Sequence, residues 1–80
     1  MKHFSDREEK IINIIGSKEL GFSEITEELF KDSKFVPFDS IISVGNSIRR
    51  IIRKCIHFDL DWTLGKFKKD SKIVIKKIKL

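Results

Sequence analysis

The stretch Ser43–Ile56, Ser-Val-Gly-Asn-Ser-Ile-Arg-Arg-Ile-Ile-Arg-Lys-Cys-Ile, decides the fold that we expect for this chain. Drawn as an α-helix at about 100° per residue, it divides into two faces. One face is apolar and consists of Val44, Ile48, Ile51, Ile52 and Cys55. The opposite face carries Asn46, Arg49, Arg50 and Arg53, flanked by Ser43, Lys54 and His57. The pattern predicts a helix that packs on a core through one side and presents guanidinium groups to solvent through the other.

Basic residues are concentrated in the second half of the chain. Residues 1–40 hold six Lys and Arg against nine Asp and Glu, whereas residues 41–80 hold eleven against three. Three of the four arginines lie within the five residues Arg49–Arg53. A small domain with one strongly basic half is typical of proteins that bind polyanions, and a solvated lysine-rich surface is the alternative interpretation.

Length and composition predict a single domain that spans residues 1–80. With 40% hydrophobic and 36% charged residues, the sequence is typical of a folded soluble protein rather than a disordered one. It contains neither an apolar run long enough for a membrane span nor the apolar core of a signal peptide, so we expect a cytoplasmic location and no membrane partner. The single Cys55 lies on the apolar face and is expected to be a core thiol.

Local signals delimit a first helix over residues 6–15. Ser5 and Glu8 have the spacing of a capping box, and the first turn is acidic, as the helix dipole favours. Isoleucines then form a wide apolar stripe, and Gly16 is a plausible helix terminator.

A second helix is expected after the short apolar link Leu20–Phe22, which is long enough for one small strand. Ser23 is expected to cap this helix, which covers residues 24–31. Its inward residues are Ile25, Leu29 and Phe30.

Residues 32–42 read as a turn-rich connection, in which Asp39 or Ser40 could cap an early turn that runs into the third helix, and its length leaves room for an extra helical turn near Pro37–Ser40. Within it we expect three apolar side chains to be buried: Phe35, Val36 and Phe38. Ile42 would fall near the polar face of a continuous helix, so we expect the third helix to begin near Ser43. Gly45 inside this helix is less favourable than alanine by about 1 kcal/mol, which indicates a kink or a close approach of another segment.

Beyond the third helix the hydrophobic period changes from 3.6 to two. The apolar residues Phe58, Leu60, Trp62 and Leu64 alternate with Asp59, Asp61 and Thr63, as in a half-buried strand whose aspartates point outward. Residues 66–72 form a polar, lysine-rich turn, and residues 73–80 are rich in β-branched side chains. The sequence therefore predicts a C-terminal antiparallel hairpin.

This order of elements makes the protein an α+β chain of three helices followed by a hairpin, and in that arrangement it resembles the winged helix-turn-helix superfamily over residues 5–80. The resemblance is one of architecture, and no short motif identifies a subfamily. It implies that the helix over residues 43–57 is a recognition helix and that the hairpin around Lys68–Ser71 is the wing. One departure is the connection of about ten residues before the recognition helix, which is often shorter in the family.

The resemblance implies sequence-specific or architectural binding of double-stranded DNA by a small transcriptional regulator. Asn46 would pair with adenine, and Arg49 or Arg50 with guanine. Phosphate contacts would come from basic side chains of the helix and the wing: Arg53, Lys54, Lys66, Lys68, Lys69 and Lys72. Ser43 and Ser47 would donate to phosphate near the helix N-terminus.

Two other functions stay open on the sequence alone. One is a protein-interaction module whose basic face docks an acidic partner, and the other is RNA binding through the same face. We expect a monomer or a weak homodimer. We expect no enzyme activity and no cofactor, since the sequence has no glycine-rich phosphate loop and no nucleophile elbow. We also expect no metal, because Cys55, His57 and His3 are too few and too badly spaced for a zinc site.

Overall fold

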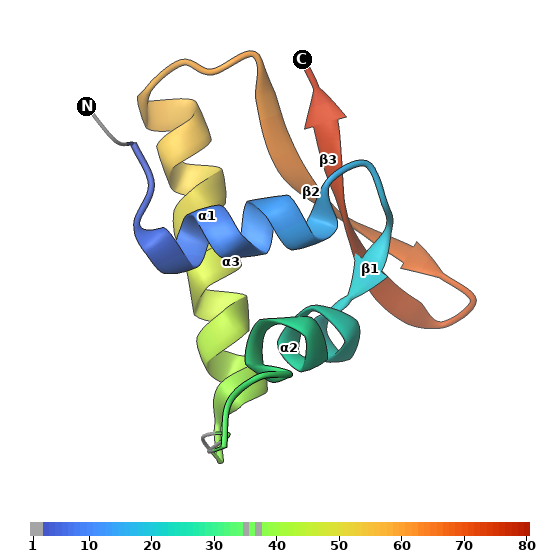
Figure 1. Cartoon of the computed structure of the whole chain (residues 1–80). Coiled ribbons are helices and arrows are strands. Elements are labelled where there is room, and N and C mark those ends of the chain that lie inside the picture. The colour runs from blue at the N-terminus through green and yellow to red at the C-terminus, as the bar shows by residue number, and fades with distance from the viewer. Residues whose placement is uncertain (1–2, 35, 37) are drawn as a thin grey trace.

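The computed structural model describes residues 3–34, 36 and 38–80, which form three helices and a three-stranded antiparallel sheet. The elements in chain order are α1 (Asp6–Ile15), β1 (Leu20–Gly21), α2 (Phe22–Phe30), α3 (Ser40–His57), β2 (Trp62–Lys69) and β3 (Lys72–Lys79). Figure 1 shows the helices gathered together and the β2–β3 hairpin projecting away from them. The predicted α+β class is confirmed, and the arrangement is compatible with a winged helix.

Helix α1 has the bounds that the sequence predicts. Ser5 Oγ accepts a hydrogen bond from the Glu8 backbone N–H at 3.2 Å, and Glu8 Oε1 accepts one from the Ser5 N–H at 2.9 Å. The helix ends at Gly16, whose φ of 52° is in the left-handed region that glycine adopts without strain. Both ends of α1 are therefore fixed by local interactions.

Helix α2 begins earlier than expected, and the prediction that Ser23 caps it is wrong. The helix starts at Phe22, its N-cap is Gly21, and the Glu24 side chain accepts a hydrogen bond from the Gly21 N–H at 3.2 Å. Ser23 lies exposed within the first turn. Strand β1 is correspondingly short, because Phe22 already belongs to the helix.

Helix α3 begins at Ser40, earlier than the expected main start near Ser43, and it is continuous to His57. Its N-cap residue is Asp39, one of the two expected for an early turn, although the Asp39 side chain makes no capping hydrogen bond. The Ser43 N–H donates to the Asp39 carbonyl at 3.0 Å, which closes the first turn. Consequently Ile42 belongs to the helix with 67% of its surface exposed. Gly45 lies opposite Phe22, and a Cβ there would be 3.7 Å from Phe22 Cε1, an ordinary contact distance.

The connection before α3 does not bury its apolar side chains as predicted. Val36 is 51% exposed and Phe38 is fully exposed. The predictions for Phe35 and Pro37 fall outside the described residues.

The hairpin is longer, and its turn tighter, than the sequence indicates. Strands β2 and β3 pair continuously from Trp62 opposite Lys79 to Lys69 opposite Lys72. Asp70 and Ser71 alone form the turn, with φ of 49° and 68°, as a type I′ turn requires. Residues 66–69 are therefore strand. The predicted strand segment 58–61 is wrong, because Asp59 lies in the left-handed region (φ 53°) directly after α3.

Strand β3 occupies the centre of the sheet, between β1 and β2. The core lies between the sheet and the helices, and all three helices contribute to it. Its buried members are Ile11, Ile15, Ile25, Val44, Ile48, Ile51, Cys55, Leu64 and Ile75. Cys55 is thus a core thiol, and burial raises its pKa above the ordinary value. Within the described ranges, none of the helices combines the length and the apolar character needed to cross a bilayer.

Candidate nucleic-acid interface

The outward side of α3 carries the residues that the sequence places there. Asn46, Arg49, Arg50 and Arg53 are all exposed, whereas the apolar residues opposite them are buried in the core, except for Ile52, which is partly buried against it. Among residues 3–34, 36 and 38–80, no carboxylate lies within 4.0 Å of the charged group of these three arginines. The guanidinium groups are therefore open to solvent and to a ligand.

The two α3 serines that were predicted to contact phosphate, Ser43 and Ser47, differ from each other in accessibility. Ser47 is only 3% exposed, because it lies three residues after Val44 and four before Ile51, on the side that packs into the core. The prediction that Ser47 donates to phosphate is therefore wrong. Ser43 is half-buried at the edge of the exposed face, so its hydroxyl remains available for a hydrogen bond to a ligand.

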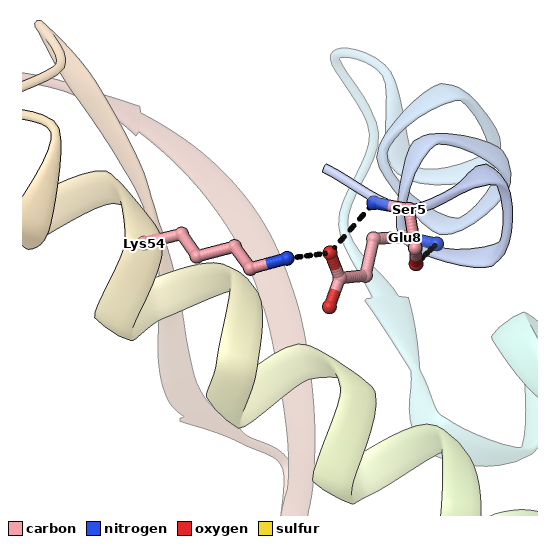
Figure 2. A network of polar contacts seen from close by, with 3 residues as sticks. All are labelled: Ser5, Glu8 and Lys54. Carbon is pink, nitrogen blue, oxygen red and sulfur yellow. Dashed lines mark hydrogen bonds and ion pairs between the residues drawn. The ribbon is translucent and has the colours of Figure 1, made fainter. Parts of the chain in front are cut away.

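Lys54 of α3 reaches across to Glu8 of α1, as Figure 2 shows. Its Nζ donates to Glu8 Oε1 at 2.6 Å, and the same oxygen accepts the capping hydrogen bond from the Ser5 N–H. Glu8 is 3% exposed. Burial alone would raise the pKa of Glu8, but Lys54 and Ser5 together outweigh it and lower the pKa below its usual range. Lys54 joins α3 to α1, so the prediction of a phosphate contact from Lys54 is not supported.

The four predicted hairpin lysines point to two sides of the sheet. Because side chains alternate along a strand, Lys66 and Lys68 share the side of the buried Leu64. Lys69 and its cross-strand partner Lys72 lie on the opposite side. A ligand that bound on the α3 side of the sheet would therefore contact Lys66 and Lys68 before Lys69 and Lys72.

Two of these lysines have internal partners. Lys66 Nζ lies 5.9 Å from the centre of the Phe22 ring. Lys69 Nζ lies 3.2 Å from Glu19 Oε2, and Lys76 lies 3.7 Å from the other oxygen of the same carboxylate. The hydrogen bond from Lys69 is the main reason that the pKa of Glu19 is lowered.

An apolar group lies at the N-terminal end of this face and was not among the predicted contact residues. Ile41 is 51% and Ile42 is 67% exposed, and the fully exposed Phe38 precedes them. The signal was present in the sequence, since Ile42 lies four residues before Asn46 and shares its side of a helix. The position of Ile42 near the polar face was instead the reason for expecting the helix to begin near Ser43.

The face as a whole offers hydrogen-bond donors, fixed positive charge and an apolar end. Toward its C-terminal end, Arg50, Arg53 and His57 border a depression of about 390 Å³ beside Phe58. These groups suit binding through phosphate oxygens and base edges. The chain matches no protein-family model, no curated protein and no solved structure with which it was compared.

Proposed function

We propose that this chain is a winged-helix domain that binds double-stranded DNA, as a small transcriptional regulator. In this proposal α3 enters the major groove and the β2–β3 hairpin lies against the neighbouring backbone as the wing. Asn46 and Arg49 or Arg50 contact bases, while Arg53 and the hairpin lysines contact phosphates.

One observation carries the proposal: the arginines of α3 are exposed and lack a carboxylate partner within the described part of the chain. Like charges on adjacent turns repel one another, so their clustering gives no stability to the free protein. A polyanion relieves that repulsion, and the planar guanidinium fork matches phosphate oxygens and guanine edges. The position of Lys66 and Lys68 on the α3 side of the sheet extends the cationic surface beyond the helix.

The test is a salt-titrated binding assay with labelled random duplex DNA. Binding should weaken steeply with salt, because each neutralised phosphate releases counterions. Changing Arg49, Arg50 and Arg53 together to alanine should abolish binding near physiological salt and flatten the log–log salt slope by up to about 2.7. The fold should persist, since all three side chains point outward.

A matched control changes three lysines away from this face, Lys10, Lys18 and Lys31, to alanine. Both triple variants lose three positive charges, so a non-specific charge effect would weaken them equally. Equal weakening, or duplex binding by the arginine variant as tight as that of the wild type, would refute the proposal. A duplex RNA and polyglutamate serve as competitors. Preferential displacement by either would favour RNA binding or an acidic protein partner instead.

A further inference from the structure

The exposed apolar end of α3 continues the cationic face along the same line. At about 100° per residue, Ile42, Asn46, Arg49 and Arg53 fall within about 60° of one another on the helix. Ile42 is 67% exposed, and Ile41 beside it is 51% exposed. Single exposed apolar residues are common, but Ile42 lies within the stripe of α3 residues that points away from the core.

The neighbours of Ile42 restrict what can cover it. Arg49 and Arg53 belong to the same stripe and lack a carboxylate partner in the described residues, so charge complementarity favours a polyanion over an apolar protein surface. The major groove of a DNA duplex is a polyanionic surface that presents one apolar group at its base edges, the C5-methyl group of thymine.

The spacing along the helix agrees with such a contact. At 1.5 Å per residue, Ile42 and Asn46 are separated by about 6 Å along the helix axis. Base pairs are about 3.4 Å apart, so the two side chains reach base pairs that are one or two steps from each other. Asn46 has the donor and acceptor pair that matches adenine. A thymine contact and an adenine contact would thus stand side by side at the N-terminal half of the helix.

We infer that Ile42 is a specificity-determining residue that contacts thymine methyl groups in the major groove, next to the adenine bound by Asn46. The protein therefore prefers A·T-rich sites. This inference rests on the proposed function and deepens it by naming the base pairs that the helix reads.

The test compares two duplexes of alternating A·T base pairs, about 20 base pairs or two helical turns long, one made with thymine and one with uracil. The two differ only in the methyl group. The wild type should bind the thymine duplex about fourfold more tightly, the effect of burying one methyl group. Ile42→Ala should bind both duplexes alike. The matched control is Ile56→Ala, because Ile56 is 73% exposed at the other end of α3 and its loss should leave the discrimination intact.

The outcomes separate this inference from the proposed function. Binding to neither duplex at low salt would overturn both. Equal binding of the two duplexes by the wild type would overturn the thymine contact and leave DNA binding standing. If Ile42→Ala keeps the discrimination but lowers the mass seen by sedimentation, the apolar end of α3 contacts a second copy of the chain, and the inference is wrong.

Discussion

The contact among Ser5, Glu8 and Lys54 predicts a large loss of stability when Glu8 is replaced by alanine. The substitution removes the acceptor of the Ser5 N–H and of Lys54 Nζ together. Hydrogen bonds to charged groups contribute about 1.5–3 kcal/mol and a helix cap about 1 kcal/mol. Since the Lys54 side chain is 34% exposed and can regain water, we take the lower end for its bond. The expected loss in the free energy of unfolding is about 2–3 kcal/mol, or a fall in Tm of about 10 °C or more.

Thermal and urea unfolding followed by circular dichroism would measure this loss at pH 7. The matched control is Glu28→Ala, which removes an ion pair of 3.1 Å to Lys31 between side chains that are about half exposed. Exposed pairs contribute little, so the Tm of this control should barely change. Equal Tm values for the two variants would refute the reasoning. So would a double-mutant cycle of Glu8→Ala with Lys54→Met that shows no coupling.

The pH dependence of the same contact has a definite sign. The pKa of Glu8 is lower in the folded chain than its ordinary value of 4.5. The charged form therefore stabilises the fold fully above the ordinary value, and this contribution is lost as the pH falls through the lower folded pKa. Glu8→Gln carries no such charge. The stability difference between the wild type and this variant should shrink between pH 7 and about pH 3, and a constant difference would contradict the shift.

Three further substitutions or modifications test other parts of the fold. Gly45→Ala should raise the unfolding free energy by about 0.5–1 kcal/mol in urea titrations, because the helix gains propensity and the new Cβ only touches Phe22. Ser71→Gly should raise it by about 1 kcal/mol, since Ser71 holds a left-handed φ of 68° that glycine adopts freely, and an unchanged urea midpoint would contradict this. Cys55 should react with a thiol reagent only as fast as the protein unfolds, because the thiol is buried and its pKa is raised; rapid labelling of the native protein would disprove the burial.

The features predicted correctly from sequence are those that local chemistry decides. The capping pair Ser5 and Glu8 and the terminator Gly16 lie within or beside α1, and no distant contact is needed to fix its ends. The two faces of α3 follow from helical periodicity in the same way. The capping signal of α2 was also local but was assigned to the wrong residue. Glu24 stands three residues after the N-cap Gly21, which is the spacing of a capping box. Serine is nevertheless the more common N-cap residue type, which led to the prediction of Ser23.

The remaining errors concern a strand segment that needs distant backbone partners and two residues of α3. Apolar alternation could not reveal that residues 66–69 are strand, because their lysines obtain backbone partners only from β3 across a two-residue turn. Ile42 falls near the polar face of a continuous helix, which led to an expected start near Ser43, whereas the helix includes Ile42 and leaves it exposed. Ser47 was assigned to the exposed face although its neighbours Val44 and Ile51 lie in the core.

Ion pairs between the acidic and basic halves of the chain determine which lysines would be available to a duplex under the proposed function. Glu19 holds Lys69 in an exposed pair, which phosphate can replace easily because such pairs contribute little. Glu8 is buried, and removing its ammonium partner would leave a carboxylate in the core, which is strongly destabilising. If DNA binds as proposed, Lys68→Ala, on the α3 side of the sheet, should reduce the log–log salt slope by about 1 while leaving Tm nearly unchanged. Lys54→Met should do the reverse, lowering Tm sharply with little effect on the slope. A reduced salt slope for Lys54→Met, measured below its Tm, would show that phosphate competes successfully with the buried carboxylate.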